Sequence, residues 1–130
     1  MGDFPRLLKA IAAATAAITL AAPMHGAAPQ SLAEKGEKLA RQHCSRCHVV
    51  ADDMGFAGIG STPSFRLLVN ALSDWRERFE TFHTRRPHPA VVRLEGIAPL
   101  SEDPPTTRTV DLKLDDIPAL VAYAATLKKQ

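Results

Sequence analysis

The sequence predicts a mainly α-helical domain with a β-hairpin inserted before the last helix. Three observations support this prediction: four stretches carry apolar residues at helical spacing, two short stretches alternate apolar and polar residues, and 130 residues suffice for one domain. Hydrophobic residues make up 45% of the chain and charged residues 23%, as in an ordinary globular protein. Aromatic residues are only 5%, so a core built from side chains alone would be small.

The first 28 residues are expected to be a secretory signal peptide. Arg6 and Lys9 form a basic start, and an uncharged, alanine-rich run follows from Ala10 to Ala22. That run is too short to cross about 30 Å of hydrocarbon as a helix. We therefore expect export to the periplasm, with a folded domain over residues 29–130 and no permanent membrane span in the mature form. The cleavage site stays open, and an uncleaved N-terminal anchor is the alternative.

Four segments are predicted to be helical. The first starts at Ser31 and Glu34, whose spacing is that of a capping box, and it contains Gly36. Glycine lowers helix propensity, so its presence here indicates close approach by another segment. Asp115 is expected to cap the last helix. The predicted helices cover residues 32–43, 63–72, 75–82 and 116–128.

Two short segments before the last helix are predicted to be strands. Residues 92–95 and residues 110–114 both alternate apolar with charged side chains, which is the period of a half-buried strand. A proline-containing loop at Pro99–Pro105 separates them. The pattern therefore predicts a β-hairpin with a long loop.

The segment Cys44-Ser45-Arg46-Cys47-His48 carries the strongest chemical signal. Two thiols at this spacing can each add to one vinyl group of haem, and the adjoining His48 can then bind the iron as proximal ligand. A disulfide, a thioredoxin-type redox pair and a zinc site are the alternatives. The disulfide would close a very short loop, the redox pair lacks a preceding βαβ unit, and zinc would need two more ligands. The motif therefore predicts one covalently attached haem c, which would also supply the missing apolar centre.

With this motif the sequence resembles the small monohaem c-type cytochromes of class I. Residues 36–44 resemble the N-terminal helix of that family, and residues 120–123 resemble the C-terminal helix that crosses it. Residues 62–65 resemble the loop whose proline carbonyl accepts a hydrogen bond from the proximal histidine. The resemblance covers most of residues 29–130. It implies a cytochrome c-like fold around one haem, with Pro63 orienting His48.

The sequence departs from that family at the sixth iron ligand. The resemblance places an axial methionine near residues 91–92, which are both valine and cannot bind iron. Met54 follows His48 so closely that the loop would hardly carry it to the opposite face of the haem. The candidate sixth ligands are therefore His88 and, as an alternative, His83. An open sixth position is the third possibility.

These features predict a periplasmic carrier of single electrons between redox proteins, or to and from a larger oxidoreductase. Histidine as sixth ligand would keep the iron six-coordinate and suit this role. An open position would instead make a five-coordinate or weakly ligated haem protein that binds NO, CO or O₂ as sensor or scavenger. The sequence shows no pair of nucleophile and general base that would indicate an enzyme. The net charge of +2 provides no concentrated basic face for nucleic acid.

Overall fold

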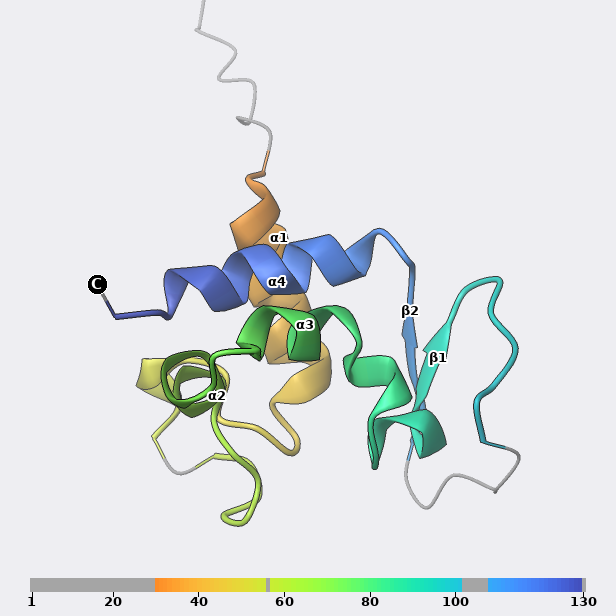
Figure 1. Cartoon of the computed structure of the whole chain (residues 1–130), viewed down its shortest axis with the longest axis horizontal. Coiled ribbons are helices and arrows are strands. Elements are labelled where there is room, and N and C mark those ends of the chain that lie inside the picture. The colour runs from red at the N-terminus through yellow and green to blue at the C-terminus, as the bar shows by residue number, and fades with distance from the viewer. Residues whose placement is uncertain (1–29, 56, 102–107, 130) are drawn as a thin grey trace, which may run out of the picture.

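The computed structural model describes residues 30–55, 57–101 and 108–129 (Figure 1). Within these ranges four α-helices and one two-stranded sheet form a mainly α fold, as predicted. The helices are α1 (Leu32–Leu39), α2 (Phe65–Ala71), α3 (Trp75–Glu80) and α4 (Asp116–Thr126), and the strands are β1 (Val92–Leu94) and β2 (Val110–Leu112). Short helical turns are η1 (Ala40–Cys44), η2 (Asp52–Met54), η3 (Phe82–Thr84) and η4 (His88–Ala90).

The predicted signal peptide lies outside the described residues. None of the helices in the described part of the chain is long and apolar enough to span a membrane.

Helix α1 begins with the predicted capping box. The Ser31 hydroxyl accepts a hydrogen bond from the Glu34 backbone N–H at 3.2 Å, and the Glu34 carboxylate accepts one from the Ser31 N–H at 2.7 Å. Two N–H groups that have no partner inside the helix are thereby satisfied. The predicted single helix over residues 32–43 is nevertheless wrong at its end, because α1 stops at Leu39 and continues as the π-helical turn η1.

Helix α4 crosses α1 at Gly36, as the glycine predicted (Figure 1). A Cβ atom at this position would overlap the backbone carbonyl oxygen of Ala119 and lie 2.8 Å from the Cβ of Tyr123. Hydrogen is therefore the largest substituent that this crossing admits. The hydroxyl of Tyr123 donates to the carbonyl of Val50 at 2.8 Å, which ties α4 to the segment that follows His48.

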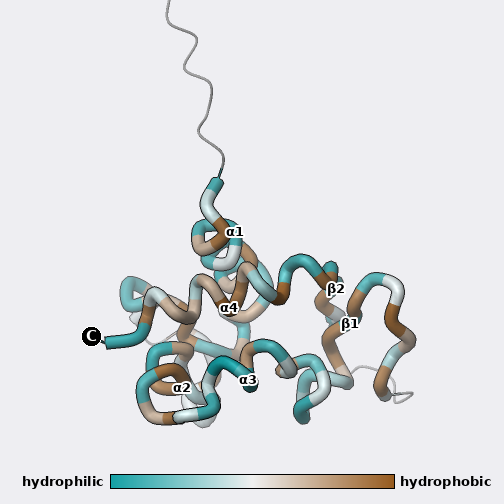
Figure 2. Tube along the Cα trace, turned by 45° about the horizontal axis from the view of Figure 1, so that its top comes forward, coloured by the Kyte–Doolittle hydropathy of each residue, from teal (hydrophilic) through white to brown (hydrophobic). Residues whose placement is uncertain are grey.

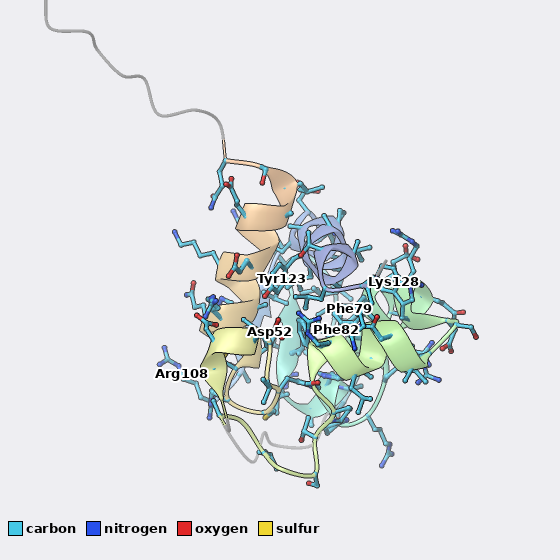
Figure 3. All side chains as sticks on the ribbon, turned by 90° about the vertical axis from the view of Figure 1, so that its left-hand side faces the viewer. Asp52, Phe79, Phe82, Arg108, Tyr123 and Lys128 are labelled. Carbon is cyan, nitrogen blue, oxygen red and sulfur yellow. The ribbon has the colours of Figure 1, made fainter. Side chains whose placement is uncertain are left out.

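The hydrophobic core contains side chains of α2, α3, α4 and both strands, together with Ala40 and Val50. Trp75 and Phe79 make an edge-to-face contact with ring centres 6.2 Å apart, and Phe65 packs edge-on against Phe79 at 4.9 Å. Figure 2 shows strongly hydrophobic residues in α2, α4 and both strands, and Figure 3 places Phe79 and Phe82 towards the centre of the molecule. The buried cluster comprises Ala40, Val50, Phe65, Val69, Trp75, Phe79, Leu94, Leu112, Leu120, Val121, Tyr123 and Ala124.

Strands β1 and β2 lie where the alternation placed them, but the predicted hairpin is wrong because the strands pair in parallel. Val92 aligns with Val110 and Leu94 with Leu112, so both strands run in the same direction. A hairpin needs only a tight turn, whereas parallel neighbours need a connection of about a dozen residues or more. Residues 95–109 provide that length. Alternation reports which side chains face the core and carries no information on strand direction.

The first turn of α4 is held to α1 by a buried carboxylate. Asp116 forms an ion pair with Lys35 at 2.7 Å and accepts a hydrogen bond from the Lys113 backbone N–H at 2.9 Å. The predicted cap, Asp115, makes no capping bond with its side chain. Burial by itself would raise the pKa of Asp116, but the hydrogen bonds from Lys35 and Lys113 hold that pKa below its usual value.

Replacing Asp116 by asparagine is expected to lower the free energy of unfolding at pH 7 by about 1 kcal/mol, because Lys35 loses its charged partner. The carboxylate has a lower pKa in the folded than in the unfolded chain, so its stabilisation is present above the unfolded pKa of about 4. It is lost as the pH falls through the folded pKa. Urea unfolding from pH 7 to pH 3 should show less acid destabilisation in Asp116→Asn than in the wild type. The neighbouring Asp115→Asn is the control, and equal pH profiles for wild type and Asp116→Asn would contradict this assignment.

Candidate functional site

The cysteine–histidine motif forms one tight turn at the end of η1. The Ser45 N–H donates to the Ala40 carbonyl at 3.1 Å, which closes the π-helical turn. The Cys47 and His48 N–H groups then both donate to the Cys44 carbonyl, at 3.1 and 2.9 Å. π-Helical turns are rare in proteins, and those that occur are often found at functional sites. As a result, both thiols and the imidazole emerge from a single compact turn.

The side chain of His48 is oriented by the backbone of Pro63. Its Nδ1 lies 2.7 Å from the Pro63 carbonyl oxygen, which is the contact that the family resemblance implies for these two residues. Because a carbonyl can only accept, Nδ1 carries the proton and Nε2 keeps its lone pair. Further backbone bonds, from Ile59 to Cys47 at 2.9 Å and from Phe65 to Val49 at 3.0 Å, hold this loop against the motif.

The two cysteines of the motif are unpaired and differ in environment. Cys44 packs against the core, whereas Cys47 is exposed. Burial raises the pKa of the Cys44 thiol to about 12, and the neighbouring Cys47 adds to the effect. Reactive redox thiols have lowered pKa values, because the thiolate is the nucleophile. Cys44 is therefore a poor attacking thiol.

The structure brings His88 next to His48. Their ring centres are 6.1 Å apart and the two ring planes are inclined by only 7°. His88 begins η4, and its Nδ1 lies 3.0 Å from the Arg85 carbonyl oxygen. Burial lowers the pKa of His88, while the hydrogen bond to Arg85 opposes that shift. The imidazole is therefore neutral near pH 7, which is the form that binds metals.

His83, the alternative sixth ligand, occupies a different environment. Among the described residues, the aromatic rings beside His48 are those of Phe65, at 5.5 Å, and His88. The ring of His83 instead lies edge-on to Phe82 at 5.9 Å, and its Nδ1 is buried without a hydrogen-bond partner. Met54 packs against the hydrophobic core.

Sequence reasoning missed the aromatic residues that frame the two imidazoles. Phe65 lies against His48, and Phe82 meets His88 edge-on with ring centres 5.4 Å apart and planes at 88°. Phe82 follows Trp75 and Phe79 at helical spacing, which is typical of a core-facing side chain and gives no sign of contact with a histidine. The short spacing between Pro63 and Phe65 was the available signal for the first pair.

These residues fit a haem attached at the motif. Two unbridged thiols adjoin an imidazole whose Nδ1 is bonded to a carbonyl, and the apolar ring of Phe65 packs against that imidazole. Within the described ranges, no three or more His, Cys, Asp or Glu side chains gather into a metal-binding group. Comparison of the chain with protein-family models, curated proteins and solved structures gave no match.

Proposed function

We propose that this chain is a periplasmic monohaem c-type cytochrome with a cytochrome c-like helical fold, and that it carries single electrons between redox proteins. The observation that carries the proposal is the geometry of His48. It directly follows the two thiols, and its Nδ1 is bonded to the Pro63 carbonyl, so Nε2 is left for the iron. In metal sites the second ring nitrogen of a histidine ligand is typically hydrogen-bonded to a carbonyl or carboxylate, which orients the ring.

The two cysteines and the histidine of the motif have separate tasks in this proposal. Cys44 and Cys47 would hold the haem through thioether bonds to its vinyl groups, and His48 would bind the iron. The bound haem supplies a reversible one-electron change at the iron. The chain contributes rigidity, because backbone hydrogen bonds hold the Pro63 loop against the motif.

The net charge of the chain affects how fast redox partners associate with it. The predicted signal peptide contains Asp3, Arg6 and Lys9, so removing it leaves 14 basic and 13 acidic residues and a net charge of +1. Long-range steering towards a strongly acidic or basic partner is therefore weak. Electron exchange with a partner should therefore depend only modestly on ionic strength. The proposed location follows from the predicted signal peptide, since export would deliver the reduced thiols to the compartment where the haem is attached.

The test is expression in a host with a c-haem maturation system, followed by haem quantification and voltammetry. We expect one haem per chain that survives acid–acetone extraction, and a reversible one-electron couple. Carbon monoxide should leave the ferrous spectrum unchanged. Loss of the haem on extraction would overturn the proposal. A carbon monoxide-induced spectral shift in a protein with attached haem would replace electron transfer by binding of NO, CO or O₂.

A further inference from the structure

The separation between the ring centres of His48 and His88 is compatible with two imidazoles on one metal ion. Their centres are 6.1 Å apart. A direct hydrogen bond between two imidazoles would place the ring centres about 5 Å apart. A metal held about 2 Å from one nitrogen of each ring would place the centres about 6 Å apart. The observed separation is therefore too wide for a hydrogen bond and agrees with a shared metal.

Both rings are also prepared in the same way for binding a metal. The Nδ1 of His48 is bonded to the Pro63 carbonyl at 2.7 Å, and the Nδ1 of His88 to the Arg85 carbonyl at 3.0 Å. In each ring the proton is thereby placed on Nδ1, and Nε2 is the nitrogen left to bind. The same outer-shell arrangement therefore occurs twice, on two segments far apart in the sequence.

Aromatic neighbours fix the planes of the two rings. Phe65 packs against His48 with planes inclined by 60°, and Phe82 meets His88 edge-on at 88°. The Arg85 side chain reinforces the second segment, because it bonds to Glu77 on α3 at 3.0 Å. These contacts come from residues other than the two histidines. The 7° angle between the ring planes is therefore set by the surrounding fold.

We propose that His88 is the sixth ligand of the iron, giving a bis-imidazole haem with nearly parallel ring planes. This inference rests on the proposed function. Two imidazoles give a six-coordinate, low-spin iron in both oxidation states, and a lower reduction potential than a histidine–methionine pair. In this proposal His88 on η4 takes the role of the axial methionine that the family resemblance places near residues 91–92.

The orientation of the rings has a spectroscopic consequence. When the two axial imidazole planes are parallel, both rings overlap the same iron d orbital through their π systems. That orbital is then separated in energy from its partner, which gives a ferric electron paramagnetic resonance signal with three resolved g values. Perpendicular imidazoles leave those orbitals nearly degenerate and give a signal dominated by one large g value. The ferric protein should therefore show the first type, and it should lack the red-edge absorption band of thioether ligation.

Three variants isolate the role of His88. His88→Ala should lose the low-spin ferric signal, bind carbon monoxide in the ferrous state, and recover low-spin character on addition of free imidazole. His88→Met should gain the thioether band and a higher reduction potential. His83→Ala is the matched control, because His83 lies on the neighbouring turn η3, and it should keep the wild-type spectrum.

The outcomes separate this inference from the proposed function. Acid–acetone-stable haem in all of these proteins tests attachment, and its absence from the wild type would defeat the proposed function itself. If haem is attached, a high-spin wild-type spectrum, or loss of the low-spin signal in His83→Ala in place of His88→Ala, would overturn the assignment of His88. A wild-type signal with one dominant large g value would overturn the parallel arrangement.

Discussion

Replacing Gly36 by alanine is expected to destabilise the protein by about 2–4 kcal/mol, although alanine is the better helix former. The added methyl group would overlap the Ala119 carbonyl oxygen and press on the Cβ of Tyr123. Both obstacles are rigid, because one is backbone and the other is the stem of a buried ring. Helices α1 and α4 would have to move apart, and the contact between Tyr123 and Val50 would be strained with them.

Urea unfolding followed by circular dichroism measures this effect, and Gly60→Ala provides its control. A Cβ at Gly60 would meet no atom within 4 Å, so this variant should change stability by no more than about 0.5 kcal/mol. Equal unfolding midpoints for the two variants would show that the two helices do not cross as closely as described. For a domain of this size, the expected loss is a large share of the total stability.

Replacing both Cys44 and Cys47 by serine is expected to abolish covalent haem attachment completely. A hydroxyl does not form the thioether bond, so neither vinyl group would be captured. Each single variant should keep one thioether, retain acid–acetone-stable haem in reduced yield, and show a shifted absorption spectrum because one vinyl group stays unsaturated.

The control for this pair is Ser45→Ala, which lies inside the same turn. The Ser45 hydroxyl donates to the Arg41 carbonyl at 2.6 Å and is not a haem-binding group in this proposal, so its loss should leave attachment intact. Haem that resists extraction from the double serine variant would mean that the cysteines do not hold it.

Features that depend on neighbouring residues could be predicted from the sequence. The capping box follows from the spacing of Ser31 and Glu34, and the close crossing follows from a glycine placed inside a helix. The motif at residues 44–48 is similarly local, since the thiols and imidazole emerge from one turn.

Features that depend on how distant segments meet could not be predicted. The alternation in residues 92–95 and 110–114 located both strands, but their parallel pairing depends on the path of the long connection between them. The choice between His83 and His88 depends on where η3 and η4 place each ring relative to His48, and the sequence offered two histidines with similar surroundings. The π-helical form of η1 could not be predicted either, because its residues would also suit an ordinary α-helix.

The intact mass of the denatured protein shows whether Cys44 and Cys47 hold one haem beside His48. The protein should be purified from a host with c-haem maturation and measured under denaturing conditions without reductant. We expect the mass of the polypeptide plus one haem, with free thiols absent. A mass equal to the polypeptide alone, or lower by the two hydrogens lost in a disulfide, would contradict it.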